Sequence, residues 1–271
     1  MVVASNPLFI TRETEEVYRA NGKDFLSSHQ LADFRKCPFL YHQKKSGLIT
    51  DEDRPAFQIG RAAHTLILEG CECFTKRYAV GGPINPKTGA SFGVNTKAYT
   101  EWAQSQGRPV LTSEHSDLVM HMAASVKAHG DAQKLLEDGI PEAVVRMDYR
   151  DVACQIRMDW YARWRGLVDL KTCDDLMWFE ADARRFGYVY QLAFYRSVLA
   201  IASGQNPDSI PVHFIAVEKK PPYRCGTWIV CPDSLRQATA ENEAAMERLK
   251  ACELTGVWPT GYEETRTFDS L

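Results

Sequence analysis

The sequence predicts an α/β fold in which a mixed central β-sheet is flanked by helices. In residues 154–160, apolar and polar side chains alternate with a period of two, as expected for a strand with one buried face. A second alternating run occupies residues 167–172 and follows the turn-forming Gly166, so the two runs form a hairpin. Segments with the apolar spacing of helices precede and follow this hairpin, which places helices around the sheet.

The overall composition limits the class of protein. The chain has 271 residues, of which 45% are hydrophobic and 25% charged, as in a globular protein with one large domain or two small ones. It has no run of about 18 apolar residues, so we expect no association with a membrane. The formal net charge of −3 argues mildly against nucleic-acid binding, although local basic patches matter more than the total.

The N-terminus and the cysteines indicate where the protein works. The first residues lack a basic segment followed by an apolar core, so secretion is not expected. Eight cysteines are scattered along the chain without a C-x-x-C pair. We therefore expect a cytoplasmic protein with reduced thiols.

The N-terminal half is predicted to be mainly helical. We expect residues 1–25 to be an irregular arm, after which Ser27 and Ser28 provide an N-cap for a helix that ends near residue 36. Further helices are predicted at residues 38–45, 54–69, 96–106, 113–128 and 132–137, an edge strand at 74–80, and a loop rich in glycine and proline at 81–95.

The C-terminal half is predicted to complete the sheet. Residues 143–149 form a strand that pairs antiparallel with the first strand of the hairpin. The elements expected after the hairpin are helices at 174–185 and 188–202, strands at 210–217 and 227–230, and a long amphipathic helix at 233–254.

Two carboxylates of the hairpin are candidate metal ligands. Asp159 and Asp169 lie on adjacent strands, close enough to share one divalent ion, and Lys171 is on the same face as Asp169. Hard oxygen ligands that leave positions open for water suit Mg²⁺ or Mn²⁺. Such an ion can activate water and neutralise charge on a phosphate, and a nearby lysine can orient or deprotonate that water. The alternative is a surface hairpin with a cross-strand Asp–Lys pair.

Further motifs occur in a fixed order around this hairpin. They are His64 in G-R-A-A-H, Asp159 in R-M-D-W, Asp169 with Lys171 in D-L-K, and Gln191 with Tyr195 in Y-Q-L-A-F-Y. Together they resemble the RecB-like branch of the PD-(D/E)xK nuclease superfamily, and within it the RecE or exonuclease VIII type of phages and prophages. The segments 26–42 and 257–262 are similar to the same group. The resemblance covers roughly residues 26–262. It implies a restriction-endonuclease-like core at about 142–231 within a single nuclease domain at 26–271.

The resemblance also implies roles for individual residues. The implied metal ligands are His64, Asp159, Asp169 and the backbone carbonyl of Leu170, with Glu142 as a weaker candidate. The implied catalytic residues are Asp159, Asp169, Lys171, Gln191 and Tyr195. The implied reaction is digestion of linear double-stranded DNA from its 5′ ends by a homo-oligomeric ring in a bacterial or phage-infected cell. The remaining 3′ single strands would pass to a RecT-like single-strand-annealing protein for recombination.

Candidate DNA contacts lie outside the metal site. Ser27 and Ser28 offer hydroxyls and free backbone N–H groups at a helix N-terminus, which favours the binding of a 5′-phosphate. The basic side chains that we expect at the DNA backbone are Arg35, Arg157, Arg184 and Arg185.

Two other functions remain open from the sequence. Some RecB-like nucleases hold an iron–sulfur cluster with one cysteine before the nuclease core and three after it. The candidates here are Cys37, Cys225, Cys231 and Cys252, which lack the close spacing that such clusters favour. The other alternative is a non-catalytic nuclease-fold module that binds DNA ends. The complete set of Asp159, Asp169 and Lys171 argues against that alternative.

Overall fold

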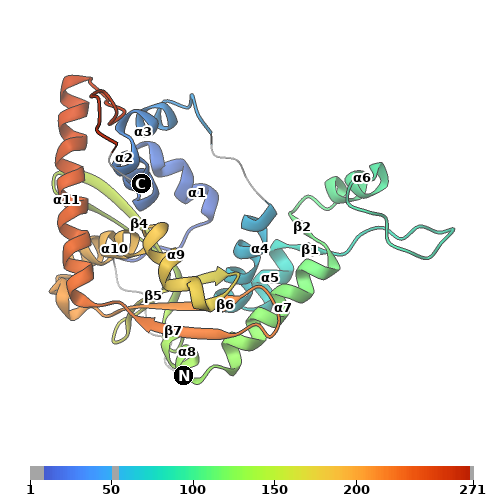
Figure 1. Ribbon diagram of the computed structural model, residues 1–271. Coiled ribbons are helices and arrows are strands. Elements are labelled where there is room, and N and C mark those ends of the chain that lie inside the picture. Colours follow the sequence, from blue (N-terminus) through green and yellow to red (C-terminus); the bar gives the residue numbers. More distant parts are fainter. Residues whose placement is uncertain (1–8, 51–54, 269–271) are drawn as a thin grey trace.

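The centre of the protein is a five-stranded mixed sheet. In the computed structural model, which describes residues 9–50 and 55–268, the strands lie in the order β3-β4-β5-β6-β7 (Figure 1). Their bounds are β3 Ile140–Tyr149, β4 Val152–Ala162, β5 Gly166–Cys173, β6 Val212–Glu218 and β7 Cys225–Ile229. Only the β5–β6 pair is parallel among these strands, and the chain between its two strands passes through helices. The predicted fold class is confirmed.

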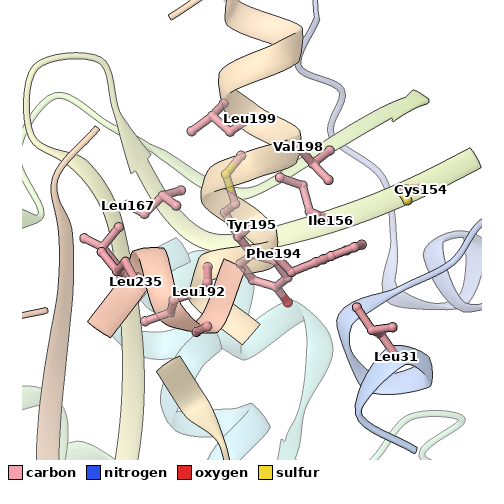
Figure 2. Packing of buried hydrophobic residues seen from close by; sticks show 14 of the residues in the cluster. Leu31, Cys154, Ile156, Leu167, Leu192, Phe194, Tyr195, Val198, Leu199 and Leu235 are labelled. Atoms are coloured by element: carbon pink, nitrogen blue, oxygen red, sulfur yellow. The ribbon is translucent and has the colours of Figure 1, made fainter. Parts of the chain in front are cut away.

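Helices cover both faces of this sheet. The first core lies between the sheet and the helices α2 (Ser28–Lys36), α10 (Tyr188–Ser203) and α11 (Pro232–Thr255). Figure 2 shows part of this core, where Leu31 of α2, Ile156 of β4 and Tyr195 of α10 point into the same space. The second core lies on the other face, under α4 (Pro55–His64), the π-helix Thr65–Glu69, α5 (Cys71–Arg77), α7 (Ser113–Ala128) and α8 (Gly130–Leu135).

β3 and β4 change the direction of their side chains in the middle of their pairing. Met158 packs in the first core, but Trp160, two positions later, packs in the second. The backbone pairing skips Glu142 and Asp159 at this point, and Glu142 has a φ of +52°, which is rare for a residue other than glycine. The predicted alternation along β4 is therefore wrong from Trp160 onward. Asp159 lies at the position where the side chains change from one face of the sheet to the other.

The edge strand predicted at residues 74–80 is confirmed only for its last two residues. This segment continues α5 and then enters the two-residue strand β1 (Ala79–Val80), which pairs with β2 (Val110–Leu111). Phe74 and Tyr78 are spaced by one helical turn, and their ring centroids lie 5.4 Å apart within the second core. Burial of this pair on one helical face outweighs the strand preference of the aromatic residues.

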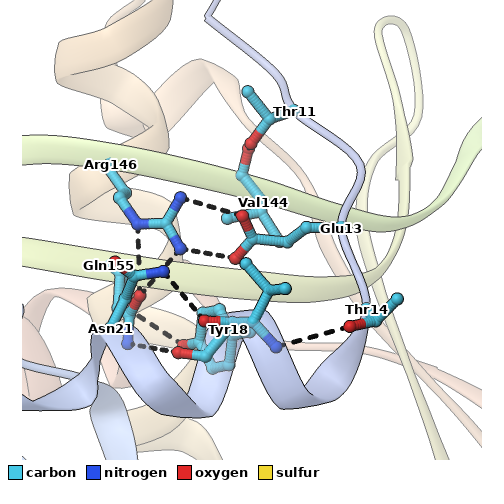
Figure 3. A network of polar contacts seen from close by, with 9 residues as sticks. Thr11, Glu13, Thr14, Tyr18, Asn21, Val144, Arg146 and Gln155 are labelled. Atoms are coloured by element: carbon cyan, nitrogen blue, oxygen red, sulfur yellow. Dashed lines mark hydrogen bonds and ion pairs between the residues drawn. The ribbon is translucent and has the colours of Figure 1, made fainter.

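The N-terminal segment is more ordered than predicted. It contains the helix α1 (Glu15–Ala20), and Thr11 exchanges backbone hydrogen bonds with Val144 at the edge of the sheet. Figure 3 shows how Arg146 of β3 holds this segment through the carboxylate of Glu13, with Gln155 beside it. The first eight residues of the predicted arm lie outside the described residues.

The remaining elements extend from this body. They are α3 (Pro38–Lys45), α6 (Lys97–Ser105) and α9 (Phe179–Arg185). Residues 81–96 and α6 project away from the sheet, and the predicted loop at 81–95 contains no helix or strand longer than a single bridge (Figure 1). None of the described helices is both long enough and apolar enough to cross a membrane.

Candidate active site

The two predicted carboxylates meet where β4 and β5 separate. Backbone pairing of these strands runs from Ala162–Gly166 to Trp160–Val168. Beyond this point the Leu170 N–H donates to Asp159 Oδ2 at 2.8 Å, so the side chain of Asp159 takes the place of a backbone acceptor. The opening between the strands gives Asp159 a fixed position next to the backbone of the D-L-K motif.

His64 approaches this opening from the other side of the sheet. It is the last residue of α4, whose Ala62 and Ala63 are fully buried in the second core and let the helix lie close to the strands. The His64 Nδ1 contacts the Gly60 carbonyl at 2.8 Å, and its Nε2 lies 3.1 Å from Asp159 Oδ2. Both neighbours are hydrogen-bond acceptors, so both ring nitrogens carry a proton in this arrangement.

Asp169 faces the first core side of the sheet together with Lys171. The Lys171 Nζ lies 2.6 Å from Asp169 Oδ2, in a contact whose angles are outside hydrogen-bond geometry. Asp169 is only 2% exposed, and neither of its carboxylate oxygens has a hydrogen-bond partner among the described residues. Burial of a carboxylate is costly, and Lys171 does not fully offset that cost, because the pKa of Asp169 is raised to about 6, so the site favours a further cation.

The two carboxylates have opposite electrostatic environments. Burial raises the pKa of Asp159, but the charge and hydrogen bond of His64 outweigh it and set the pKa at about 2. For Asp169, burial and the neighbouring Asp159 outweigh Lys171 and raise the pKa to about 6. Burial lowers the pKa of His64, but Asp159 more than offsets it, and the pKa is about 9. Burial also opposes the charge of Lys171, yet Asp169 raises the pKa of the lysine above its usual value.

The predicted pair on α10 lies against this site. Gln191 Nε2 donates to the Tyr195 hydroxyl at 3.0 Å. Burial raises the pKa of Tyr195 to about 12, while the nearby side chains of Ser28 and Gln191 lower it. Ser28 Oγ is buried and makes no directed hydrogen bond within the described part of the chain. The first residue of α2 therefore reaches the same region as the Q-x-x-x-Y helix.

Glu142 and Arg157 form an ion pair at the β3–β4 side of the site. The Arg157 Nε lies 2.7 Å from Glu142 Oε2, and their side chains are 18% and 14% exposed. Burial and the charge of Asp159 raise the pKa of Glu142 to about 7. Glu142 thus lies within electrostatic reach of Asp159, and its role as a weak metal ligand stays a prediction. Arg157 is engaged inside the protein, and its predicted contact with DNA stays a prediction.

The other predicted DNA contacts fall into two groups. Arg35 stacks on the Tyr190 ring at 3.5 Å and donates to Asn242 at 2.9 Å, and Ser27 caps α2 by accepting from the Gln30 N–H. Both have structural roles in these contacts. The exposed side chains of Arg184 and Arg185 at the end of α9 are the second group, and they face solvent.

One contact of the site was not assigned a role from the sequence. The Lys171 Nζ lies 4.7 Å from the centroid of the Tyr188 ring, at the start of α10. Tyr188 shares a helical stripe with Gln191 and Tyr195, and that spacing is the sequence signal that could have included it.

The residues present fit a hard divalent cation. Within the described ranges, no group of three or more His, Cys, Asp or Glu side chains forms a complete metal cage. Mg²⁺ does not need one, because it is usually held by one or two carboxylates and keeps several waters. Asp169, with two oxygens lacking directed partners, and Asp159 beside it match that requirement. Whether the Leu170 carbonyl joins them stays a prediction.

The cysteines have local roles. Cys37 Sγ accepts from the Leu40 N–H at 3.4 Å and caps α3. Cys225, Cys231 and Cys252 are all free thiols, on β7, before α11 and within α11. The described residues therefore give the iron–sulfur alternative no preformed site.

Comparisons with known proteins bear on the family and the fold. No curated protein matches the chain. A crystal structure of a Eubacterium rectale protein, described as "Putative exonuclease", matches with a TM-score of 0.67 at 18% sequence identity, and the match covers 96% of this chain and 97% of that one. At this identity the match shows a shared fold. The model of the family "PDDEXK-like domain of unknown function (DUF3799)" matches residues 27–270. The chain therefore belongs to this PDDEXK-like family and has the PD-(D/E)xK nuclease fold.

Proposed function

We propose that the protein is a metal-dependent DNA exonuclease. The observation that carries this proposal is the buried Asp169 carboxylate, which is in contact with Lys171 and within electrostatic reach of Asp159 where β4 and β5 separate. The family fold and the description of the Eubacterium rectale protein as an exonuclease support the same activity.

Each residue of the site has a physical task in this proposal. A bound Mg²⁺ or Mn²⁺ would supply an activated water and neutralise charge on the phosphate. Asp159 and Asp169 would hold the ion, and the contacts of Asp159 with His64 and the Leu170 N–H fix its carboxylate. Lys171 keeps its proton because Asp169 raises its pKa, so its ammonium group can orient water or stabilise a phosphate oxygen.

We further propose that digestion starts at 5′ ends and leaves 3′ single strands. The motifs shared with RecE-type enzymes support this polarity, and with it a homo-oligomeric ring and a RecT-like annealing partner. Ser28 adds a structural argument, because its buried hydroxyl lies at the N-terminus of α2, near Tyr195. A helix N-terminus favours an anion such as a 5′-phosphate.

Linear duplexes labelled separately at the 5′ and 3′ ends test the activity and its polarity. We expect Mg²⁺-dependent release of short products from the 5′ label first, and faster digestion of 5′-phosphorylated than of 5′-hydroxyl ends. Ser28→Ala should narrow that difference, while Ser116→Ala, a change of another buried helical serine, should not. Absence of cleavage with both Mg²⁺ and Mn²⁺ would refute the nuclease proposal, and release of the 3′ label first would refute the polarity alone.

A further inference from the structure

Two stacked aromatic rings, with a cation at each end, lead from the candidate active site to the surface. The Lys171 Nζ lies 4.7 Å from the centroid of the Tyr188 ring. Tyr188 stacks on Phe186, with ring centroids 5.8 Å apart and ring planes inclined by 30°. The Arg185 guanidinium carbon lies 5.4 Å from the centroid of the Phe186 ring. Two contacts therefore connect the lysine of the site to Phe186.

The backbone between α9 and α10 explains why these rings stack. Residues two positions apart in a helix do not face one another. Gly187, between Phe186 and Tyr188, has a φ of +70° in the left-handed region, which ends α9 and starts α10. Glycine adopts this conformation without the steric cost that other residues meet. The turn brings the two rings together on the side of Lys171.

The outer ring of this pair is open to solvent. Tyr188, the inner ring, packs against Phe214 of β6, with ring centroids 6.2 Å apart. Phe186 is 57% exposed, and its neighbour Arg185 is also exposed. An exposed aromatic ring beside a guanidinium is the combination on which single-stranded nucleic-acid binders stack bases, because every base has a π-face. A base lying on Phe186 would remain next to an arginine that attracts its phosphate.

We propose that Phe186, with Arg185, is a stacking platform for an unpaired nucleobase next to the reacting phosphate. This inference rests on the proposed nuclease function and adds a substrate preference to it. The enzyme would act on nucleotides whose bases have left the duplex at the reaction centre. Duplex ends that open easily would then be digested faster than stable ends of the same length. Phe186 is a positioning residue in this proposal, because it holds the base and not the reacting atoms.

Binding and cleavage together test the platform. Fluorescence anisotropy in Ca²⁺ would measure the affinity of labelled DNA that carries either a normal nucleotide or an abasic analogue at each of the three terminal 5′ positions. Stacking on an aromatic side chain contributes about 1–3 kcal/mol per base, which is roughly 5-fold to 150-fold in Kd. For the parent protein, we expect the abasic analogue at one of the three positions to weaken the affinity for DNA by a factor in this range. Phe186→Ala should bind intact DNA with a Kd raised by a similar factor. Its Kd should change by less than about twofold when the abasic analogue replaces the normal nucleotide.

Three further variants make the result specific. Phe186→Trp keeps a π-face and should retain the abasic effect, whereas Phe186→Leu keeps an apolar side chain and should lose it. Phe268→Ala removes a phenyl ring that is 88% exposed near the C-terminus, and it should behave like the parent protein. If one of the substitutions at Phe186 impairs folding, the comparison of the other two still decides the outcome.

The possible outcomes separate the two proposals. Mg²⁺-dependent cleavage by the parent protein with an undiminished abasic effect in Phe186→Ala would overturn the platform and leave the nuclease function standing. If the parent protein binds DNA and shows the abasic effect but does not cleave, and Phe186→Ala loses that effect, the nuclease function is overturned and the platform is supported. A parent protein that neither binds nor cleaves DNA would overturn both.

Discussion

Asp169→Asn is the most direct test of the metal site. The amide keeps the size of the buried side chain and removes its charge, so a divalent ion loses one of two carboxylates. Metal ions contribute several kcal/mol to the stabilisation of a phosphoryl transition state, and each 1.4 kcal/mol changes a rate about tenfold. We therefore expect the single-turnover rate of DNA cleavage to fall by about three orders of magnitude.

The same variant gives a second readout that does not depend on cleavage. A ligand present at 100 times its Kd stabilises the folded state by about 2.7 kcal/mol. For a domain of this size, about 1 kcal/mol shifts Tm by roughly 2 °C. Saturating Mn²⁺ should therefore raise the Tm of the parent protein by about 5 °C and leave that of Asp169→Asn nearly unchanged.

Asp174→Asn is a matched control for both measurements. It is the same change on the chain that follows β5, at a side chain that is 68% exposed and lies 3.0 Å from Lys219. This control should cleave DNA and respond to Mn²⁺ like the parent protein. A cleavage rate of Asp169→Asn within about tenfold of the parent, together with an equal rise in Tm, would refute the reasoning.

Three further predictions follow from the contacts around the site and from the fold. Lys171→Met should slow single-turnover cleavage by at least about 100-fold while the Kd for DNA changes little, and a loss of affinity at an unchanged rate would contradict its catalytic role. EDTA should abolish cleavage and Ca²⁺ should support binding only, whereas efficient cleavage in either condition would exclude the proposed chemistry. Glu218, held by Arg224 and the Leu176 N–H, has its pKa lowered from 4.5 to about 2. Its stabilisation is therefore complete above about pH 4.5 and is lost as the pH falls toward 2. In urea unfolding, Glu218→Gln should be less stable than the parent protein by about 1–2 kcal/mol at pH 7, with a smaller difference at pH 3. A difference in stability that does not depend on pH would argue against stabilisation by the charged Glu218 carboxylate.

The sequence predicted the elements whose patterns are strong. α7 has the expected bounds, and α10 and α11 differ from their predicted bounds by one residue at most at each end. The order of motifs also predicted which side chains gather, because His64, Asp159, Asp169 and Lys171 meet in space. Local periodicity and motif order are sufficient for this level of detail.

Other features depend on information that a single sequence does not display. The switch of side-chain direction at Asp159 coincides with the positive φ of Glu142, a conformation that a glutamate in a sequence does not signal. Arg35 and Arg157 are visibly basic, but their partners Asn242 and Glu142 come from other elements. A charge in a sequence shows what a side chain can attract and not what already neutralises it.

The pairing of Thr11 with Val144 has a consequence for how the protein avoids contact with itself. β3 lies at one edge of the sheet, and an uncovered edge strand is a template for strands of other molecules. Residues 9–25 act as a built-in cover for that edge, although the family match begins only at residue 27. A shortened protein that starts at Ser27 would keep the family domain but leave the backbone N–H and carbonyl of Val144 without Thr11 and leave Arg146 without Glu13. We expect its solubility limit, measured by sedimentation at increasing concentration, to be lower than that of the full chain, because an uncovered strand edge promotes aggregation.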